Sequence, residues 1–328
     1  MNLTHLFAAS LILTAVAPVT ASYSHDAMAV YERPVRRVEV APGRSLNLDC
    51  RGVGAPTVIL EAGWSSWSLD WAQVHDTLAR TTQVCAYDRA GMGFSDAAPR
   101  RASLASITTD LETLLKAGNI AGPYVLVGHS KAAVFVRAFA AGHLDEVAGL
   151  VLLDPGSPEA DPAMRDAAAD AQLEALLRNC LKRAQADALD PDSPTDGFCI
   201  GRGEPYWGAQ LQQTYLVLQR RPAYAVARRN ELSIPNDALA ASARGPGALG
   251  DRPLRILTSD QGLSRAIPAE RRAKLQAERL AVNAGMAKLS SRGEHDVVAQ
   301  SGHMIMQDQP RAVIEAVNAV VTEVRANR

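Results

Sequence analysis

Short, mostly apolar runs alternate with helix-like stretches along most of the chain, and this alternation constrains the fold more than any other feature. Such runs are typical of strands that are buried on both faces, and the intervening helices cover them. The apolar runs lie at residues 57–60, 83–87, 124–127, 149–153, 254–258 and 296–299, and helical patterns lie at 107–117, 271–290 and 311–325. The sequence therefore predicts an α/β fold with a mostly parallel sheet covered on both faces.

Two segments depart from this alternation. Residues 37–40 and 45–49 alternate polar and apolar side chains around Pro42-Gly43, which predicts a hairpin with one solvated face. The stretch between Asp154 and Arg252 is too long for a connecting loop and contains two helix-rich parts. We expect residues 157–250 to form a helical cap over the carboxyl ends of the strands, where open α/β sheets place their sites.

The composition and the N-terminal residues limit the partners and the location of the protein. With 34 basic and 35 acidic residues among 328, the charge gives no reason to expect nucleic acid or an anionic membrane as a partner. Residues 1–21 carry no Lys, Arg, Asp or Glu, and their apolar run is too short to span a bilayer comfortably. We expect a signal peptide cleaved after Ala21 and an exported, periplasmic or secreted, mature chain of residues 22–328. Since the leader lacks a basic residue, another export route or an uncut anchor stays open. No later segment has the pattern of a membrane span.

Four cysteines permit two disulfides in an exported chain. Cys180 and Cys199 flank a loop rich in proline and aspartate, and we expect them to pair. For Cys50 and Cys85, a disulfide and two buried free thiols are both compatible with the sequence.

One apolar run leads into the motif that carries chemistry. The run 124–127 is followed by Gly128-His129-Ser130-Lys131-Ala132 and then by a helix-like stretch. A serine at a tight strand-to-helix turn is the context of a nucleophile elbow, in which the hydroxyl is exposed. The preceding glycine permits that turn. We expect Ser130 to be a nucleophile, although a serine in an ordinary loop would give the same pentapeptide.

A serine hydroxyl needs an adjacent base, and His303 is the best-placed candidate. It follows the last apolar run and precedes the final helix, so it should lie at the same sheet edge as Ser130. A carboxylate must then orient the imidazole. Asp154 and Asp260 each end an apolar run, and both fit the chain order serine, acid, histidine. Asp154 is favoured, and Asp260 is the alternative acid.

The oxyanion of an acyl-transfer reaction needs backbone N–H groups directed at it. Lys131 follows the nucleophile and supplies one such group, and Trp64, after the run 57–60, is placed to supply another. Gly63, Ser65 and Trp207 are candidate substrate contacts. A solvated loop explains Ser65, and a packed cap core explains Trp207, at least as well.

The histidines show no ligand-like spacing with cysteines or carboxylates, so we expect no metal and no organic cofactor. The expected partner is a small-molecule substrate.

Five segments in this order resemble the α/β-hydrolase superfamily: residues 58–71, 87–96, 127–130, 147–155 and 301–310. The resemblance covers nearly all of the mature chain. It implies an eight-stranded, mostly parallel sheet with helices on both faces, a helical cap and a serine nucleophile. It also implies neighbouring strands for Cys50 and Cys85, which makes a disulfide between them possible. The loop 87–96 is expected to be structural, with Asp88 and Arg89 tying it down.

The resemblance also bears on the acid and on the elbow. Many members place the acid after the seventh strand, where Asp260 is near but out of register. A minority, including some haloalkane dehalogenases, use the carboxylate that ends the sixth strand, and Asp154 matches that position. Dehalogenase chemistry is disfavoured because those enzymes have Asp in place of Ser130. The elbow departs from the usual pattern, since Lys131-Ala132-Ala133 replaces a bulky residue and two glycines; the Lys131 ammonium is expected to point into the pocket or out to solvent.

These features predict an exported serine hydrolase that cleaves a carboxylic ester or related acyl bond through Ser130, His303 and Asp154. Two alternatives remain. One is a lyase or carbon–carbon hydrolase that uses the same triad, and the other is a non-catalytic binding protein, which the altered elbow favours.

Overall fold

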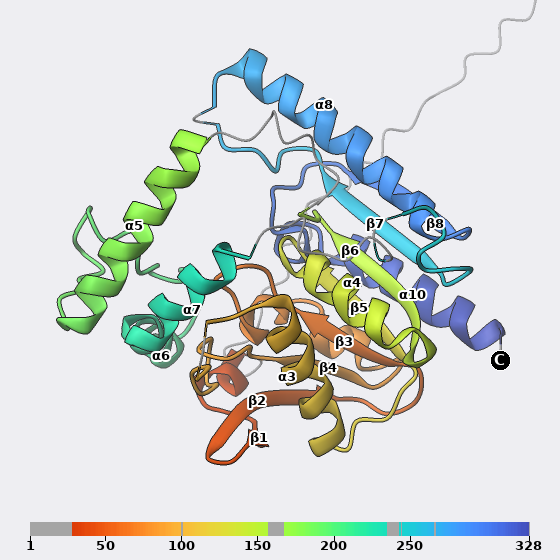
Figure 1. Ribbon diagram of the computed structural model, residues 1–328, viewed down its shortest axis with the longest axis horizontal. Coiled ribbons are helices and arrows are strands. Elements are labelled where there is room, and N and C mark those ends of the chain that lie inside the picture. Colours follow the sequence, from red (N-terminus) through yellow and green to blue (C-terminus); the bar gives the residue numbers. More distant parts are fainter. Residues whose placement is uncertain are drawn as a thin grey trace, which may run out of the picture.

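An eight-stranded sheet forms the centre of the molecule (Figure 1). The computed structural model describes residues 28–99, 101–156, 167–234, 243, 245–265 and 267–327. The strands are β1 (Arg36–Ala41), β2 (Arg44–Arg51), β3 (Thr57–Glu61), β4 (Val84–Tyr87), β5 (Tyr124–His129), β6 (Val147–Leu153), β7 (Leu254–Ser259) and β8 (Gly293–Val298). Their order is β1-β2-β4-β3-β5-β6-β7-β8. The six strands from β4 onward in this order pair in parallel, and β2 pairs antiparallel with both β1 and β4. The sheet is therefore mostly parallel, which confirms the predicted fold class.

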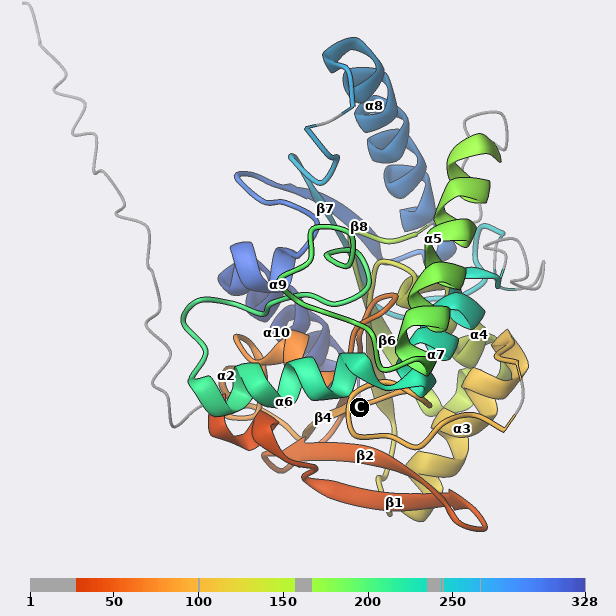
Figure 2. The same ribbon diagram turned by 90° about the vertical axis from the view of Figure 1, so that its left-hand side faces the viewer.

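Helices cover both faces of this sheet. The helices of the described chain, including those beside the sheet, are η1 (Ala29–Glu32), η2 (Ser68–Trp71), α2 (His75–Leu78), α3 (Leu104–Ala117), α4 (Ala132–Gly142), η3 (Leu144–Glu146), α5 (Ala167–Gln185), α6 (Ala209–Arg220), α7 (Pro222–Leu232), α8 (Ala269–Met286), η7 (Ala287–Leu289), α9 (Ile305–Asp308) and α10 (Pro310–Ala326). Alternate strand residues point to opposite faces. Leu126 packs with α3, α4 and α8, whereas Val125 and Val127 pack with α2, α9 and α10. Figure 2 shows α10 on one side of the strands and α3 and α4 on the other.

The predicted hairpin is confirmed, because β1 and β2 pair antiparallel and are joined at Pro42-Gly43. The predicted start of the last strand, in contrast, is wrong. β8 begins at Gly293, three positions before the predicted residue 296. Among the described strands β8 pairs only with β7, so it forms an edge of the sheet. Its first residues are polar and partly exposed, and a search for apolar runs therefore misses them.

Helices α5, α6 and α7 lie together beside the sheet, in the stretch between β6 and β7 where the cap is expected (Figure 1). The bounds 157–250 remain a prediction, because residues 157–166 and 235–242 lie outside the described ones. The expected signal peptide, residues 1–21, also lies outside them. None of the described helices combines the length and the apolar character that a membrane crossing requires.

Two disulfides join the four cysteines. Cys50 and Cys85 face each other across β2 and β4, with 4.0 Å between their Cα atoms. Cys180 of α5 is joined to Cys199 in the segment that follows, with 5.2 Å between the Cα atoms. The expected Cys180–Cys199 disulfide is present. Cys50 and Cys85, for which the sequence left two possibilities open, also form a disulfide.

We predict that no cysteine of the purified, non-reduced protein reacts with iodoacetamide under denaturing conditions, and that all four react after reduction. Each disulfide removes two thiols from reaction, so the intact mass reports the bonds directly. Two adducts without reductant would mean that one of the two bonds is absent in solution.

Candidate active site

The site lies at the carboxyl ends of the parallel strands. Ser130 follows β5, and Asp154 follows β6, the strand beside it; the last residues of the two strands, His129 and Leu153, are register partners. His303 lies in the segment between β8 and α9. Because neighbouring parallel strands end at one edge of a sheet, these three residues from distant parts of the chain meet there.

Ser130 lies on a tight turn in left-handed backbone conformation, with φ +53°. A non-glycine residue in this region is strained and is held by its surroundings. Here the Ser130 amide donates to the carbonyl of Leu153 (2.9 Å), and the amide of Gly156 donates to the carbonyl of Ser130 (2.9 Å). A Cβ at Gly128 would lie 2.8 Å from Val136 Cγ2, so the residue before the elbow must be small.

The two alanines that depart from the family pattern fit this elbow. Ala132 and Ala133, at the start of α4, are completely buried in packed apolar surroundings. The methyl groups therefore occupy space that the packing provides, and the altered elbow does not displace Ser130.

A continuous chain of hydrogen bonds joins the three predicted triad residues. His303 Nε2 lies 2.9 Å from Ser130 Oγ, and His303 Nδ1 lies 2.6 Å from Asp154 Oδ2. The Asp154 side chain is fully buried, whereas the His303 side chain is 44% exposed, so the imidazole is open to solvent at the site. An imidazole that donates from Nδ1 to a carboxylate presents the lone pair of Nε2 to the serine hydroxyl.

The other oxygen of Asp154 is held by groups that the sequence did not indicate. Oδ1 accepts hydrogen bonds from Ser259 N (3.0 Å), Ser259 Oγ (3.0 Å) and Arg279 Nη1 of α8 (2.5 Å). Burial alone would raise the pKa of Asp154, but the hydrogen bond from His303 and the charge of Arg279 outweigh it and hold the pKa below its ordinary value. Asp154 is therefore ionised at neutral pH and able to stabilise a protonated His303.

Asp260, the alternative acid, has a different position. Its two carboxylate oxygens accept from the backbone amides of Gln300 and Ser301, each at 3.0 Å. Asp260 thus holds the loop that leads to His303 rather than the imidazole itself. Asp154 is the acid that the geometry brings to His303.

The predicted oxyanion segment lies directly against the nucleophile. A Cβ at Gly63 would lie 3.4 Å from Ser130 Cβ and 2.8 Å from His129 Nδ1, so only glycine fits there. Ser65 has φ +64°, another strained position. Within the described part of the chain, the Trp64 amide donates to no protein acceptor. An amide in this state next to Ser130 is suited to bind an oxyanion.

Lys131 immediately precedes α4, where the first amides of a helix have no partner within the helix. Its side chain takes neither of the two expected directions. Nζ donates to the carbonyl of Ile234, which lies just after α7, so the ammonium reaches the cap.

Trp207 belongs to the expected cap and packs in an aromatic cluster instead of reaching the triad. Its ring lies 5.0 Å from the ring of Tyr215, in a cluster with Trp67 and Tyr224, and no contact joins it to Ser130 or His303 within the described residues. Contacts of substrate with Gly63, Ser65 and Trp207 remain predictions.

A second carboxyl lies near the triad and was missed. Asp70 of η2 is partly buried and accepts a hydrogen bond from Ser66 Oγ. Burial raises the pKa of Asp70 to about 6, against the opposing effects of Ser66 and of the charges of Arg89 and His303. Asp70 lies within the segment 58–71 that resembles the family, but no feature of that segment indicated a role for it, and Arg279 lies in no local pattern that indicates a site. Over the described residues, no group of three or more His, Cys, Asp or Glu side chains could hold a metal ion.

His129, within the elbow, packs between the oxyanion segment and the histidine loop. It is 2% exposed, and its Nε2 lies 2.9 Å from the carbonyl of His303, which requires a proton on Nε2. Burial, together with the charge of His303, lowers the pKa of His129 to about 3. His129 is therefore a neutral support for the loop that carries His303.

We predict a pH-dependent contribution of His129 to stability. The unfolded chain binds a proton at His129 below the ordinary pKa of about 6.5, while the folded protein does not until about pH 3. The contribution is complete above pH 6.5 and is lost as the pH falls toward 3, by up to roughly 5 kcal/mol. The stability difference between the wild type and His129→Gln, from urea unfolding at pH 4 to 8, should therefore shrink toward low pH. A difference that is constant with pH would contradict the buried neutral state.

Comparisons with known proteins agree with this fold. Residues 41–316 match the family described as "Alpha/beta hydrolase family". A thermophilic esterase from Thermogutta terrifontis has a similar structure, with a TM-score of 0.64 and 19% identity over 88% of this chain and 99% of that one. A putative lipase from Acinetobacter baumannii AYE has a TM-score of 0.67 and 18% identity over 93% of this chain and 98% of that one.

Curated relatives match shorter segments. The uncharacterized protein YqjL of Bacillus subtilis is 32% identical over 105 residues, which cover 32% of this chain and 42% of that protein. The chain spans less than half the length of the curated relatives it matches.

Proposed function

The chain belongs to the alpha/beta hydrolase family, and we propose that it is a serine hydrolase that cleaves a carboxylic ester or a related acyl bond. The observation that carries the proposal is the hydrogen-bond chain from Ser130 Oγ through His303 to Asp154. The esterase and the putative lipase of similar fold support the choice of an acyl bond.

In the proposed acylation, Ser130 Oγ attacks the carbonyl carbon of the substrate while His303 Nε2 accepts the hydroxyl proton. The carbonyl π electrons move to oxygen and form a tetrahedral oxyanion. The amides of Trp64 and Lys131 stabilise this charge. When the oxyanion collapses, the bond to the leaving group breaks, and His303 transfers its proton to that group.

In the proposed deacylation, water takes the place of the leaving group. His303 accepts a proton from water, and the resulting hydroxide attacks the acyl carbon. When the second tetrahedral intermediate collapses, the bond between the acyl carbon and Ser130 Oγ breaks, His303 transfers its proton to Ser130 Oγ, and the carboxylic acid is released. Throughout, Asp154 keeps the imidazole in the tautomer that has its proton on Nδ1 and stabilises the imidazolium.

We further propose that the protein is exported and that residues 157–250 form the cap that selects the substrate. Two disulfides are compatible with an oxidising compartment. Helices α5, α6 and α7 supply the described part of the cap.

Rapid mixing of the protein with p-nitrophenyl butyrate tests the proposed reaction. An acyl-enzyme that forms faster than it hydrolyses gives a burst of p-nitrophenol before the steady state, and mass spectrometry of the quenched protein should find a butyryl group on Ser130. Release of p-nitrophenol with no covalent intermediate under any condition, or no turnover of acetyl, butyryl and octanoyl esters, would contradict the proposal. If none of these esters is turned over, turnover of a ketone substrate would indicate a lyase or carbon–carbon hydrolase. Ligand binding without any turnover would indicate a binding protein.

A further inference from the structure

One residue of the loop 87–96 does more than hold that loop. Asp88 ties the loop down as predicted, because it accepts from Ser68 N (3.0 Å) and Phe94 N (2.9 Å). Arg89, in contrast, points inward and is 4% exposed. Its guanidinium lies between the end of β3, the oxyanion segment and helix α7 of the cap.

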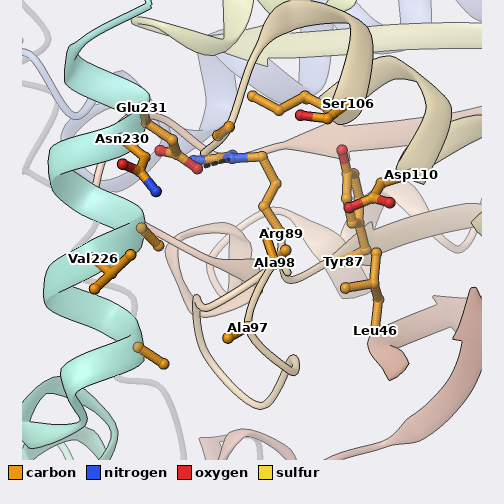
Figure 3. Close-up of a pocket in the computed structure, with 15 residues that line it drawn as sticks. Leu46, Tyr87, Arg89, Ala97, Ala98, Ser106, Asp110, Val226, Asn230 and Glu231 are labelled. Atoms are coloured by element: carbon orange, nitrogen blue, oxygen red, sulfur yellow. Dashed lines mark hydrogen bonds and ion pairs between the residues drawn. The ribbon is translucent and has the colours of Figure 1, made fainter. Parts of the chain in front are cut away.

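All five N–H groups of Arg89 have acceptors. Nε and Nη2 donate to the two oxygens of Glu231 at 2.7 and 2.9 Å, a bidentate pair. Nη1 donates to Glu61 Oε1 (2.9 Å) and to the carbonyl of Ala62, and Nη2 also donates to the carbonyl of Gly63 (2.7 Å). Glu231 belongs to α7 and is 3% exposed (Figure 3). The guanidinium is thus fixed in position and orientation.

The bond to the Gly63 carbonyl has a consequence for the neighbouring amide. The C=O of Gly63 and the N–H of Trp64 belong to one planar trans peptide group, so they point in opposite directions. When Arg89 holds the carbonyl on one side, the Trp64 N–H is directed to the other side. A rotation of this peptide would remove the proposed oxyanion donor without moving Ser130.

Two further contacts come from the same face of α7. The hydroxyl of Tyr224 donates to the carbonyl of Ser65 (3.0 Å), and the indole Nε1 of Trp64 donates to the carbonyl of Arg228 (2.7 Å). Residues 224, 228 and 231 are spaced by four and three positions, which places them on one side of a helix. Three successive residues of the oxyanion segment, Gly63 to Ser65, are therefore held by α7, one of them through Arg89.

We propose that α7 of the cap positions the oxyanion donor of the active site, with Arg89 and Glu231 as positioning residues. A displacement of α7 would break the bidentate Arg89–Glu231 pair and the contacts of Trp64 and Ser65 with α7, so the hydrolase reaches full activity only with α7 in place. This inference rests on the proposed function.

A pocket borders the Arg89–Glu231 pair. Besides the pair, it is lined by Ala97, Ala98 and Ala102 and by residues of α3 and α7 (Figure 3). Asn230 and Val226, also on α7, face it.

The test compares kcat and KM of Arg89→Met, Glu231→Gln and the double variant with those of the wild type, using p-nitrophenyl butyrate. Loss of one oxyanion donor costs roughly 10²- to 10³-fold in kcat. We expect kcat to fall about 10²-fold in Arg89→Met and about 10-fold in Glu231→Gln. KM should change less than about threefold, because the donor acts on the transition state and not on the bound ester. The double variant should be no slower than Arg89→Met, because the two residues act as one unit.

A boronic acid inhibitor supplies the readout that a merely structural role would not change. Its tetrahedral adduct on Ser130 places an oxygen where the oxyanion forms, so its Ki should rise by the same factor as kcat/KM falls. Glu174→Gln is the matched control, since Glu174 pairs with Arg229 on α7 but does not contact Arg89. Its kcat should stay within about twofold of the wild type.

Folding is checked by circular dichroism, and Arg89→Lys, which keeps the charge, replaces Arg89→Met if that variant does not fold. The proposal is overturned if kcat is unchanged, if KM alone rises, if the effects of the two residues multiply, or if Glu174→Gln is equally slow. A wild type that shows no covalent intermediate refutes the proposed function as well, whereas an active wild type with unaffected variants refutes only the role of α7.

Discussion

Ser130→Ala should lower kcat for p-nitrophenyl butyrate by roughly 10⁴- to 10⁶-fold while the protein stays folded. The substitution removes the nucleophile, and the residual rate then comes from binding and from the oxyanion donors alone. Among the described residues the hydroxyl bonds only to the half-exposed His303, so its loss should shift the melting temperature by only a few degrees. Steady-state kinetics with thermal unfolding of the same sample measures both effects.

Ser66→Ala is the control for this variant. Ser66 lies in the same segment as Trp64, and its hydroxyl binds Asp70 rather than His303. We expect its kcat to change less than about tenfold. Equal losses in the two variants would mean that Ser130 has no special role, and an active Ser130→Ala protein would exclude it as the nucleophile.

Asp154→Asn should lower kcat by about 10³- to 10⁴-fold with little change in KM, because the amide favours the wrong tautomer of His303 and does not stabilise the imidazolium. Asp260→Asn should lower kcat less than about tenfold. Asp260 binds two backbone amides in the loop before His303, so its main expected effect is a lower melting temperature.

The pair of variants decides between the two candidate acids. A large loss of kcat in Asp260→Asn together with a small one in Asp154→Asn would reverse the assignment. Comparison of kcat at equal folded fraction, from thermal unfolding of each variant, separates the catalytic effect from the structural one.

The parts of the fold that depend on local pattern could be predicted from the sequence. Strands β3 to β7 are buried between helices, so their apolar runs identify them, and the elbow is indicated by the serine that follows β5. The order of Ser130, Asp154 and His303 at strand ends was sufficient to predict that they meet at one sheet edge. The start of β8 was missed because an edge strand does not need apolar residues on both faces.

The supporting residues of the site could not be predicted in this way. Arg279 contacts Asp154 across 125 positions, and Arg89 contacts Glu231 across 142. Such pairs depend on how α7 and α8 pack on the sheet, and a helical arginine or glutamate has the same local pattern whether it faces solvent or a buried partner. The loop motif around Arg89 indicated a structural role, but its partners on the cap carry no signal in the sequence.

The measurement that tests the central claim most directly is mass spectrometry of the purified protein after reaction with a fluorophosphonate, with Ser130→Ala alongside. Such a probe reacts with an activated serine and mimics the tetrahedral oxyanion intermediate. We expect one adduct, on the peptide that contains Ser130, and no adduct in the variant. A folded wild-type protein that forms no adduct, or forms it on another residue, would contradict the account.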